Sequence, residues 1–535
     1  MAVRTASADD HPRNLGPMDQ PLNSVPSLRE HLSAFSLIFT ALFLTHAALL
    51  RLPYFWDEAG YYIPAARDVL LTGDLIPHTT LSNAHPPLLM LYLAGWWKFS
   101  GYTPAVTRIA MLLVACFALL GIWRLAAVVS NRTIAALAVL CTAIYPVFFA
   151  QSTLAHLDML AGVFTLWGLA YYIENKPGRS IVLLALASLA KETAVLAPVV
   201  LCGWEIIQPA RFRLRERNLG RALLYLLCGL PLALWFVYHH HRTGYFLGNP
   251  DYLRYNLGAT LTPLRIVLAL GLRLWHTLGY MNLFVLTLLT AAAMLEPAQD
   301  SRKRIALPVQ MTFYVLIAAY VLALAVLGGA VLARYLLPVY PLIVLVCVST
   351  LHRRLRWWPA AISVVVASFI AGLLFNPPYR FAPEDNLTYR DYVLLHKEAA
   401  NYLALHAHGA RVLTAWPASD EISRPFLGYV KEPVPVVRIE NFSPAQMQLA
   451  SAGQEQYDWA YVFSTKYEPP HLLIHSAVWE RMQRRFFDYH TDLPPEIAAQ
   501  MIGGRIVYRA QRRGEWVALI QIERPENARL EPPTP

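Results

Sequence analysis

Two adjacent acids, Asp57 and Glu58, stand directly after the first long apolar stretch of the chain. Trp56, Tyr61 and Tyr62 flank them, so the acids fall where a membrane surface is expected. A carboxylate at that depth is costly unless it is solvated or has a task, and it is also a suitable base for a hydroxyl proton. Residues 56–62 are therefore the first candidate for chemistry, although interfacial aromatics beside surface acids would give the same pattern.

Three further polar residues stand out for their surroundings. His85 lies just ahead of a Pro-Pro pair that suits a helix start. Lys191 falls at the centre of the apolar segment 181–207, at roughly mid-bilayer depth, where an ion without a task would cost several kcal/mol. Lys191 has an alternative role as a simple partner of its neighbour Glu192. Arg334 is expected at the outer end of a helix, where snorkelling and phosphate binding are both plausible.

The composition places these residues in a membrane protein. Of the 535 residues, 56% are hydrophobic and only 15% are charged, which is too apolar for a soluble chain of this length. The net charge of +10 does not indicate a nucleic-acid partner, because Arg and Lys concentrate in short connectors between apolar stretches. The five cysteines all fall within apolar segments, which excludes a disulfide scaffold in the polar tail.

The apolar stretches predict the path through the membrane. Segment 181–207 reads either as one crossing helix or as a short hairpin, and the hairpin puts the basic connectors 211–221, 302–304 and 353–356 on the side of the N-terminus. We therefore expect about eleven membrane helices, two of them short, with the N-terminus in the cytoplasm and the C-terminal region outside. The other candidate stretches are 33–52, 105–129, 133–150, 157–173, 220–238, 280–295, 307–327, 335–351 and 358–375.

The predicted fold class is a polytopic α-helical membrane protein with interfacial helices in its first outer loop and a C-terminal, outer-side, small α/β domain. Its parts are a cytoplasmic tail (1–32), a transmembrane domain (33–375) and an extracytoplasmic domain (376–535). The outer loops are 53–104 and 239–279; 58–72 and 86–100 in the first loop suit interfacial helices. In the outer domain, 388–406 has helical spacing, whereas 411–416, 457–463, 505–508 and 516–522 read as strands.

Three motifs taken together resemble one enzyme superfamily. They are the acidic pair after the first helix, the HPPL sequence at 85–88 and the RYLLP sequence at 334–338. The ensemble, which spans most of 33–375, is similar to the GT-C glycosyltransferases, above all the protein O-mannosyltransferases and the lipid A aminoarabinose transferases. His85 occupies a position at which the aminoarabinose transferases carry Lys, so this chain departs there toward the mannosyltransferase pattern.

The resemblance implies roles for the acids, whereas the candidate cations Lys191 and Arg334 follow from the predicted topology. Asp57 would be the catalytic carboxylate and Glu58 a neighbour that helps to bind acceptor or donor. Asp158, which opens the fourth apolar segment, would position the sugar or act as a second base, although an acid at a helix start is also an ordinary finding. Lys191, Arg334 and His85 are the candidates for holding the donor phosphate. Trp56, Tyr61 and Tyr62 are the candidates for binding substrate.

No cofactor is required by such a reaction. The histidines at 239–241 do not form an evident metal site, because adjacent residues on a helix point in different directions. A divalent ion shared with Glu58 or His85 stays an open alternative.

The leading hypothesis is thus an enzyme of the inner (plasma) membrane that moves a sugar from a polyprenyl-phosphate donor to a lipid, glycan or protein acceptor at the outer face. The alternative is a polytopic transporter or flippase, since transporters also place ionisable residues at mid-depth between helices. Two halves of related topology would favour a transporter, and the sequence has none that we detect.

Overall fold

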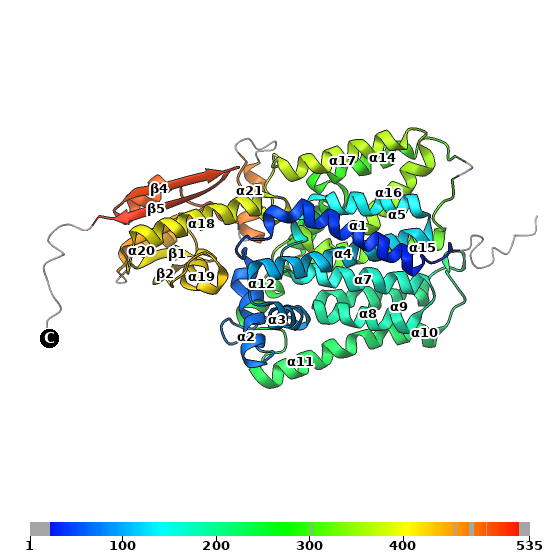
Figure 1. The fold of residues 1–535 in the computed structure, drawn as a ribbon, viewed down its shortest axis with the longest axis horizontal. Coiled ribbons are helices and arrows are strands. Elements are labelled where there is room, and N and C mark those ends of the chain that lie inside the picture. The colour runs from blue at the N-terminus through cyan, green and yellow to red at the C-terminus, as the bar shows by residue number, and fades with distance from the viewer. Residues whose placement is uncertain (1–21, 300–301, 454–455, 470–475, 488, 524–535) are drawn as a thin grey trace, which may run out of the picture.

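The structure is a computed structural model that describes residues 22–299, 302–453, 456–469, 476–487 and 489–523. Most of the expected N-terminal tail, at 1–21, and the last twelve residues, at 524–535, lie outside the described residues. The molecule has a helical part and, at one end of it, a smaller part built around a sheet (Figure 1). The fold class is therefore the one predicted from the sequence.

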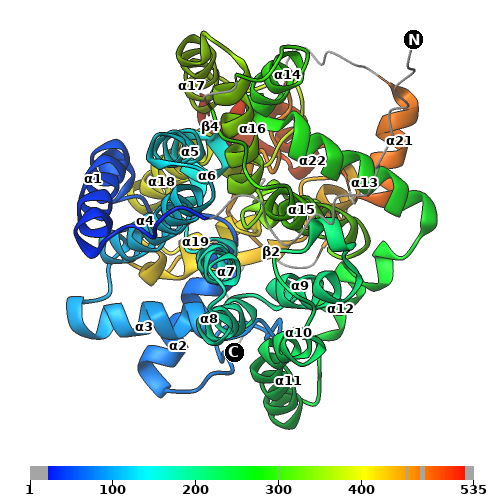
Figure 2. The same ribbon diagram turned by 90° about the vertical axis from the view of Figure 1, so that its right-hand side faces the viewer.

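The helical part follows the apolar stretches closely. Five helices or helix pairs are long and apolar enough to cross a membrane, and four more are shorter, among the residues that the structure describes. The count of about eleven spans stays a prediction, since length and composition alone identify these candidates. Figure 2, which looks along the helices, shows α1, α11 and α17 at the rim. The helices with these bounds are α1 (Leu28–His46), α4 (Pro104–Val129), α5 (Arg132–Ile144), α6 (Pro146–Gln151), α7 (Leu157–Ile173), α8 (Pro177–Ala190), α9 (Leu196–Ile207), α10 (Leu219–Leu224), α11 (Leu230–Thr243), α12 (Pro250–Asn256), α13 (Pro263–Leu278), α14 (Leu283–Ala293), α15 (Leu307–Val326), α16 (Tyr340–Arg354) and α17 (Trp358–Leu374).

The first helix begins earlier than the apolar run that predicted it. Ser27 accepts a hydrogen bond from the backbone N–H of Glu30, whose side chain in turn accepts one from the Ser27 N–H. This capping box satisfies two N–H groups that a helix start leaves unpaired, so α1 begins at Leu28 rather than at residue 33.

The segment that allowed two topologies is a hairpin. α8 ends at Ala190, Lys191 is extended (φ −153°, ψ 133°), and a 3₁₀ turn at Glu192–Val195 leads into α9. Beyond α9, Arg215 donates to the Asn175 side chain at 2.7 Å, which places the two ends of the segment side by side. The hairpin prediction is thereby confirmed, and Lys191 sits at its tip.

The first loop contains the two helices expected there. A π-helical turn at Glu58–Tyr62 continues into α2 (Ile63–Thr72), and α3 (Leu88–Ser100) follows the Pro-Pro pair. Gly73 has φ +76°, a left-handed conformation that favours glycine and ends α2. In the loop at 239–279, α12 and α13 form, and α13 packs against α15.

The sheet has five strands in the order β2-β1-β3-β5-β4. β1 pairs in parallel with both β2 and β3, whereas β5 pairs antiparallel with β3 and β4. The helix α18 packs against β4 and β5. β2 and the short helices were not predicted. The elements are α18 (Thr388–His406), β1 (Val412–Ala415), α19 (Ala418–Ser423), β2 (Val436–Ile439), α20 (Pro444–Ala452), β3 (Trp459–Phe463), α21 (Ala477–Phe486), α22 (Pro495–Ile502), β4 (Gly504–Arg512) and β5 (Glu515–Ile522).

Hydrogen bonds join the sheet part to the first loop. The Tyr429 hydroxyl donates to the Tyr54 carbonyl at 3.0 Å, and the Tyr54 N–H donates to Leu427 at 3.4 Å. The Tyr102 hydroxyl donates to the Phe426 carbonyl at 3.0 Å. The sheet part therefore rests directly on the loop that carries the acidic pair.

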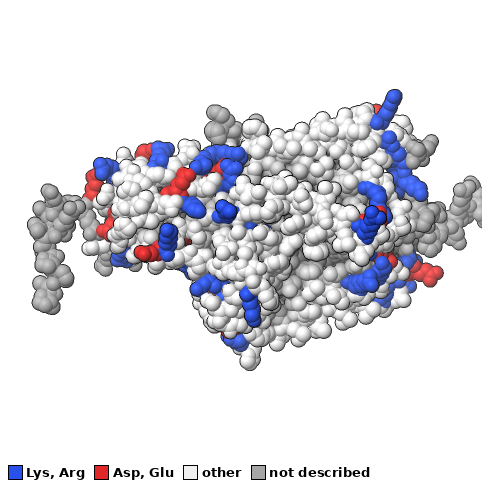
Figure 3. Space-filling model, viewed as in Figure 1, with Lys and Arg blue, Asp and Glu red and all other residues white. Residues whose placement is uncertain are grey.

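Charged side chains gather at the two ends of the visible face and leave the flank of the helices between them largely uncharged (Figure 3). We call the end of the helices that meets the sheet the sheet end, and the opposite end, where the connectors with Arg215, Arg302 and Arg354 lie, the basic end. An uncharged flank between charged ends is what a protein in a bilayer requires.

Candidate active site

A cavity of about 700 Å³ lies at the sheet end, between the helices and the sheet part. Its wall draws on the first loop, the tip of the hairpin, the segment after α15 and the sheet part. Seven of the nine candidate residues line it: Trp56, Asp57, Tyr61, Tyr62, His85, Lys191 and Arg334. The other two, Glu58 and Asp158, do not.

Arg334 is the centre of the charge network. It lies in a 3₁₀ turn (Ala333–Leu336) and is only 2% exposed. Its guanidinium pairs with Asp57 and, at 2.8 Å, with the Glu384 carboxylate. Its Nε lies 3.4 Å from an oxygen of Asp158. A buried guanidinium with several carboxylates around it is held in one orientation.

Lys191 pairs with Asp158 rather than with its neighbour Glu192. The Nζ–Oδ1 distance to Asp158 is 2.5 Å, and the ammonium lies 3.8 Å from the centre of the Tyr335 ring. The alternative of a Lys191–Glu192 pair is wrong, because the extended backbone at Lys191 sends consecutive side chains to opposite sides. Asp158, at 2% exposure, stands behind both cations and holds them.

His85, rather than Lys191, pairs with Glu192. Its Nδ1 lies 3.1 Å from the Glu192 carboxylate, and its Nε2 lies 3.5 Å from the Tyr252 hydroxyl. The Trp235 indole donates to the Ala84 carbonyl at 2.8 Å and so fixes the backbone just before His85. His85 thus reaches the cavity with a carboxylate partner already in place.

The histidines at 239–241 do not act together. His239 contacts the Ser82 hydroxyl at 2.8 Å, whereas His240 stacks on Phe246. No group of three or more His, Cys, Asp and Glu side chains that could hold a metal ion occurs within the described ranges.

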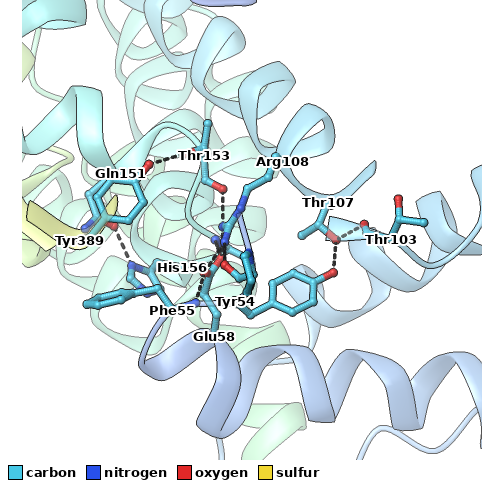
Figure 4. A network of polar contacts seen from close by, with 12 residues as sticks. Tyr54, Phe55, Glu58, Thr103, Thr107, Arg108, Gln151, Thr153, His156 and Tyr389 are labelled. Carbon is cyan, nitrogen blue, oxygen red and sulfur yellow. Dashed lines mark hydrogen bonds and ion pairs between the residues drawn. The ribbon is translucent and has the colours of Figure 1, made fainter. Parts of the chain in front are cut away.

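Glu58 is a buried structural residue in this arrangement. Both of its oxygens accept from the Arg108 guanidinium, one also accepts from the Ala155 N–H at 2.6 Å, and the other accepts from the Phe55 N–H at 2.8 Å (Figure 4). Glu58 is 0% exposed and Arg108 is 1% exposed. Its lone pairs are therefore all used and it does not line the cavity, so this geometry offers Glu58 no contact with donor or acceptor.

Asp57 points the other way, into the cavity, and its side chain is 32% exposed. Trp56 has φ +43°, a left-handed conformation that is uncommon for a bulky residue. Asp57 itself has helical backbone angles (φ −59°, ψ −28°), and successive residues of a helix point in different directions, so one carboxylate meets the cavity and the next meets Arg108. Backbone strain like that at Trp56 is concentrated at functional sites.

The sheet part contributes residues that the sequence did not point to. Glu384 lies in a 3₁₀ turn (Pro383–Asp385) at the cavity wall, and burial raises the pKa of its carboxyl to about 8, although Arg334 opposes this. The Trp416 ring stands at right angles to Trp56, 5.1 Å from it. A Cβ at Gly60 would lie 2.7 Å from the Trp416 Nε1, so glycine leaves room for the indole. No motif marks either residue, because each meets the site only through the fold.

Many of the residues that line the cavity are apolar. Leucines from the end of α15, the following segment and the region of α12 face it, together with Phe236. A cavity lined by both charged groups and apolar side chains suits an amphiphile with a small anionic group. The apolar residues are Phe236, Leu247, Leu253, Leu257, Leu324, Leu327 and Leu332.

The arrangement of the helices and the sheet part is also found in solved structures. Two crystal structures of ArnT from Cupriavidus metallidurans are similar to the chain at a TM-score of 0.50. The apo structure is 13% identical, with 91% of this chain and 98% of that chain covered. The structure bound to undecaprenyl phosphate is 14% identical, with 92% and 98% covered. An Archaeoglobus fulgidus oligosaccharyltransferase, in complex with Zn and sulfate, has a TM-score of 0.45 at 11% identity, with 80% and 68% covered.

No protein-family model and no curated protein matches the sequence.

Proposed function

We propose that the protein is a glycosyltransferase that moves a sugar from a polyprenyl-phosphate carrier to an acceptor hydroxyl at the outer face of the membrane. One observation carries the proposal: Asp57, Lys191 and Arg334 reach the same cavity, which apolar side chains also line. The likeness to ArnT, whose structure includes bound undecaprenyl phosphate, supports a lipid phosphate as the donor's charged group. The sheet end would face outside and the basic end would face the cytoplasm.

The donor phosphate would bind between the two cations. Lys191 and Arg334 are already neutralised by carboxylates, so an arriving phosphate competes with those carboxylates rather than meeting bare charge. Asp57 is the exposed member of the set and therefore the one that the phosphate displaces with the least rearrangement. Asp158 is buried and keeps both cations in position throughout.

Displacement would switch Asp57 on as a base. A carboxylate that accepts hydrogen bonds from a guanidinium has fewer lone pairs free to take a hydroxyl proton. Once the phosphate occupies Arg334, Asp57 accepts the acceptor's hydroxyl proton while that oxygen bonds to the anomeric carbon. The bond from that carbon to the phosphate oxygen breaks, and the lipid phosphate leaves with the electron pair. Lys191 and Arg334 stabilise the new charge, and the single displacement inverts the anomeric centre.

The aromatic residues at the sheet end would hold the sugar and acceptor. Trp56, Tyr61, Tyr62 and Trp416 surround the space next to Asp57. Their rings present flat apolar faces that suit the C–H face of a sugar, whereas their N–H and O–H groups supply hydrogen bonds. Hexose and pentose donors, and lipid, glycan or protein acceptors, all remain candidates on this chemistry.

The test is a transfer assay with the purified full chain in micelles. A panel of radiolabelled polyprenyl-phosphate sugars should reveal release or transfer of label, and Asp57→Asn should lower the rate by a factor of about 100 to 10,000. Asp251→Asn is the matched control, because this acid is 86% exposed on α12 and lies outside the cavity wall.

Asp57→Asn protein that is folded and as active as the parent would refute the catalytic role. A parent that transfers no sugar but carries a labelled lipid-linked or small anionic substrate across liposomes would instead identify a transporter or flippase. The two outcomes differ in whether the glycosidic bond is broken.

A further inference from the structure

A second cavity, of about 220 Å³, lies at the basic end of the helices. It is formed where the end of α14, the connector before α15, the first turns of α15 and the last turns of α16 come together. This site is far along the helices from the first cavity, since the sheet is at the other end (Figure 1). It has no part in the proposed reaction. Its lining residues are Met294, Arg304, Ile305, Gln310, Tyr314, Val346, Ser349, Thr350, Arg353 and Arg354.

The charged residues among this cavity's lining are all basic. Three arginines line it, Arg304, Arg353 and Arg354, and none of the lining residues that the structure describes is Asp or Glu. None of the three forms an ion pair among the residues that the structure describes. Three guanidinium groups gathered around one small cavity repel one another, so an anion placed between them removes an unfavourable interaction.

Hydrogen bonds to backbone carbonyls hold part of this arginine cluster in place. Arg354 donates to the Met294 carbonyl at 3.0 Å and to the Glu296 carbonyl at 2.5 Å, at the end of α14. The Gln310 amide donates to the Ile305 carbonyl at 2.6 Å, which holds the connector against α15. The Arg353 side chain has no hydrogen-bonding partner among the described residues, although it lines the same space. The guanidinium donors of Arg353 are thus available to a ligand.

The surroundings of the cavity are apolar as well as basic. Met294 is 61% exposed, the adjacent Leu295 is 88% exposed and Tyr314 is 44% exposed. These side chains stand beside the arginines at the edge of the uncharged flank. A ligand that satisfies both features carries a phosphate group next to hydrocarbon chains. Basic pockets between membrane helices at the cytoplasmic side are suited to the headgroups of anionic lipids.

We propose that this cavity binds the phosphate of an anionic membrane phospholipid. Arg353 and Arg304 contact the phosphate oxygens, Ser349 and Thr350 offer hydroxyl groups, and the acyl chains lie along Tyr314 and Met294. The site brings the end of α14, the start of α15 and the end of α16 together around one ligand. It is independent of sugar transfer, so the proposed function can fail without affecting it.

Binding can be measured on the intact protein without any activity assay. The full chain in neutral detergent is titrated with short-chain phosphatidylglycerol, and bound lipid is counted by native mass spectrometry. Arg353→Gln should weaken binding about fivefold or more, as expected when one phosphate-contacting charge is lost. Arg356→Gln is the matched control, because it removes the same charge at the same end from an exposed residue outside the cavity wall.

Two further titrations, with a zwitterionic lipid and with inorganic phosphate, test which class of ligand the site takes. Phosphatidylcholine, which is zwitterionic, should bind at least fivefold more weakly than phosphatidylglycerol. If millimolar inorganic phosphate displaces the lipid completely and raises the thermal midpoint equally, the site takes a free anion and the lipid proposal is overturned. Equal binding by the parent and Arg353→Gln also overturns it. If Arg353→Gln does not fold, the same comparison applies to Arg304→Gln, whose side chain is exposed.

Discussion

Replacement of Glu58 by Gln tests whether Glu58 serves the structure while its neighbour Asp57 serves the reaction. Glu58 and Asp57 are neighbours in the chain, yet one is fully buried against Arg108 and the other faces the cavity. Glu58→Gln keeps the shape of the side chain but removes its charge and turns one oxygen into an NH₂ donor. That donor would face the Arg108 guanidinium or the N–H groups of Phe55 and Ala155, which are donors themselves.

The size of the effect follows from burial. Loss of one partner of a buried ion pair costs about 3–5 kcal/mol, because the remaining charge stays in a medium of low polarity. Arg108 would keep the carbonyls of Pro53 and Thr153, each at 2.8 Å, and at most the remaining amide oxygen as acceptors, but it would have no opposite charge. Asp57→Asn should cost less than about 1 kcal/mol, since Asp57 is partly exposed and Arg334 keeps Glu384 and Asp158.

The assay measures the free energy of unfolding of the parent and both variants by SDS titration in mixed micelles, alongside sugar transfer. We expect Glu58→Gln to lose stability, with any remaining folded protein still able to transfer sugar. Asp57→Asn should do the reverse. A Glu58→Gln protein with the parent's stability and no activity would refute the assignment of Glu58 to structure.

Two other substitutions test different parts of the molecule. Lys191→Met should weaken donor binding by roughly 10- to 150-fold, the value of one charge-assisted hydrogen bond to phosphate, while Asp158 keeps Arg334 as a partner; equilibrium binding of the labelled donor measures this. Burial raises the pKa of the Glu515 carboxyl in the sheet part to about 7, so its contribution to stability is full below the unfolded value of about 4.5 and is lost as pH rises through 7. Glu515→Gln should therefore stabilise the protein at pH 8 by about 3 kcal/mol relative to the parent, with only a small difference at pH 4.5. Thermal midpoints of both proteins at the two pH values measure this. If the variant and the parent have the same pH dependence, the raised pKa of Glu515 is contradicted.

Local patterns in the sequence predicted local elements well. The helix expected at 388–406 has those bounds in α18, and the interfacial helices expected at 58–72 and 86–100 form with shifts of at most two residues. Helical spacing and helix-start signals act within a few residues of chain, which is why they can be read without the fold. β2 was missed because Val436–Ile439 is short and follows Pro433 and Pro435, which usually mark loops.

The candidate site was predicted as a set of residues but not as a set of pairs. Lys191 and Asp158 are 33 positions apart, and Glu58 and Arg108 are 50 apart. Nothing in the chain near Glu58 indicates that an arginine on α4 neutralises it. Glu384 likewise joins Arg334 from 50 positions away. Pairing of this kind depends on how helices pack, and the sequence alone carries no short-range signal for it.

The bonds between Tyr54 and the segment that contains Leu427 and Tyr429 have an implication for how such proteins diverge. These bonds join the first loop to the sheet part. Asp57 of the first loop and Trp416 of the sheet part line the same cavity. On the proposed function, preference for one acceptor over another would therefore depend jointly on the first loop and on the sheet part. A chimera that exchanges the C-terminal domain alone would disturb the contacts between that domain and the first loop. An exchange meant to change specificity should therefore replace the first loop as well.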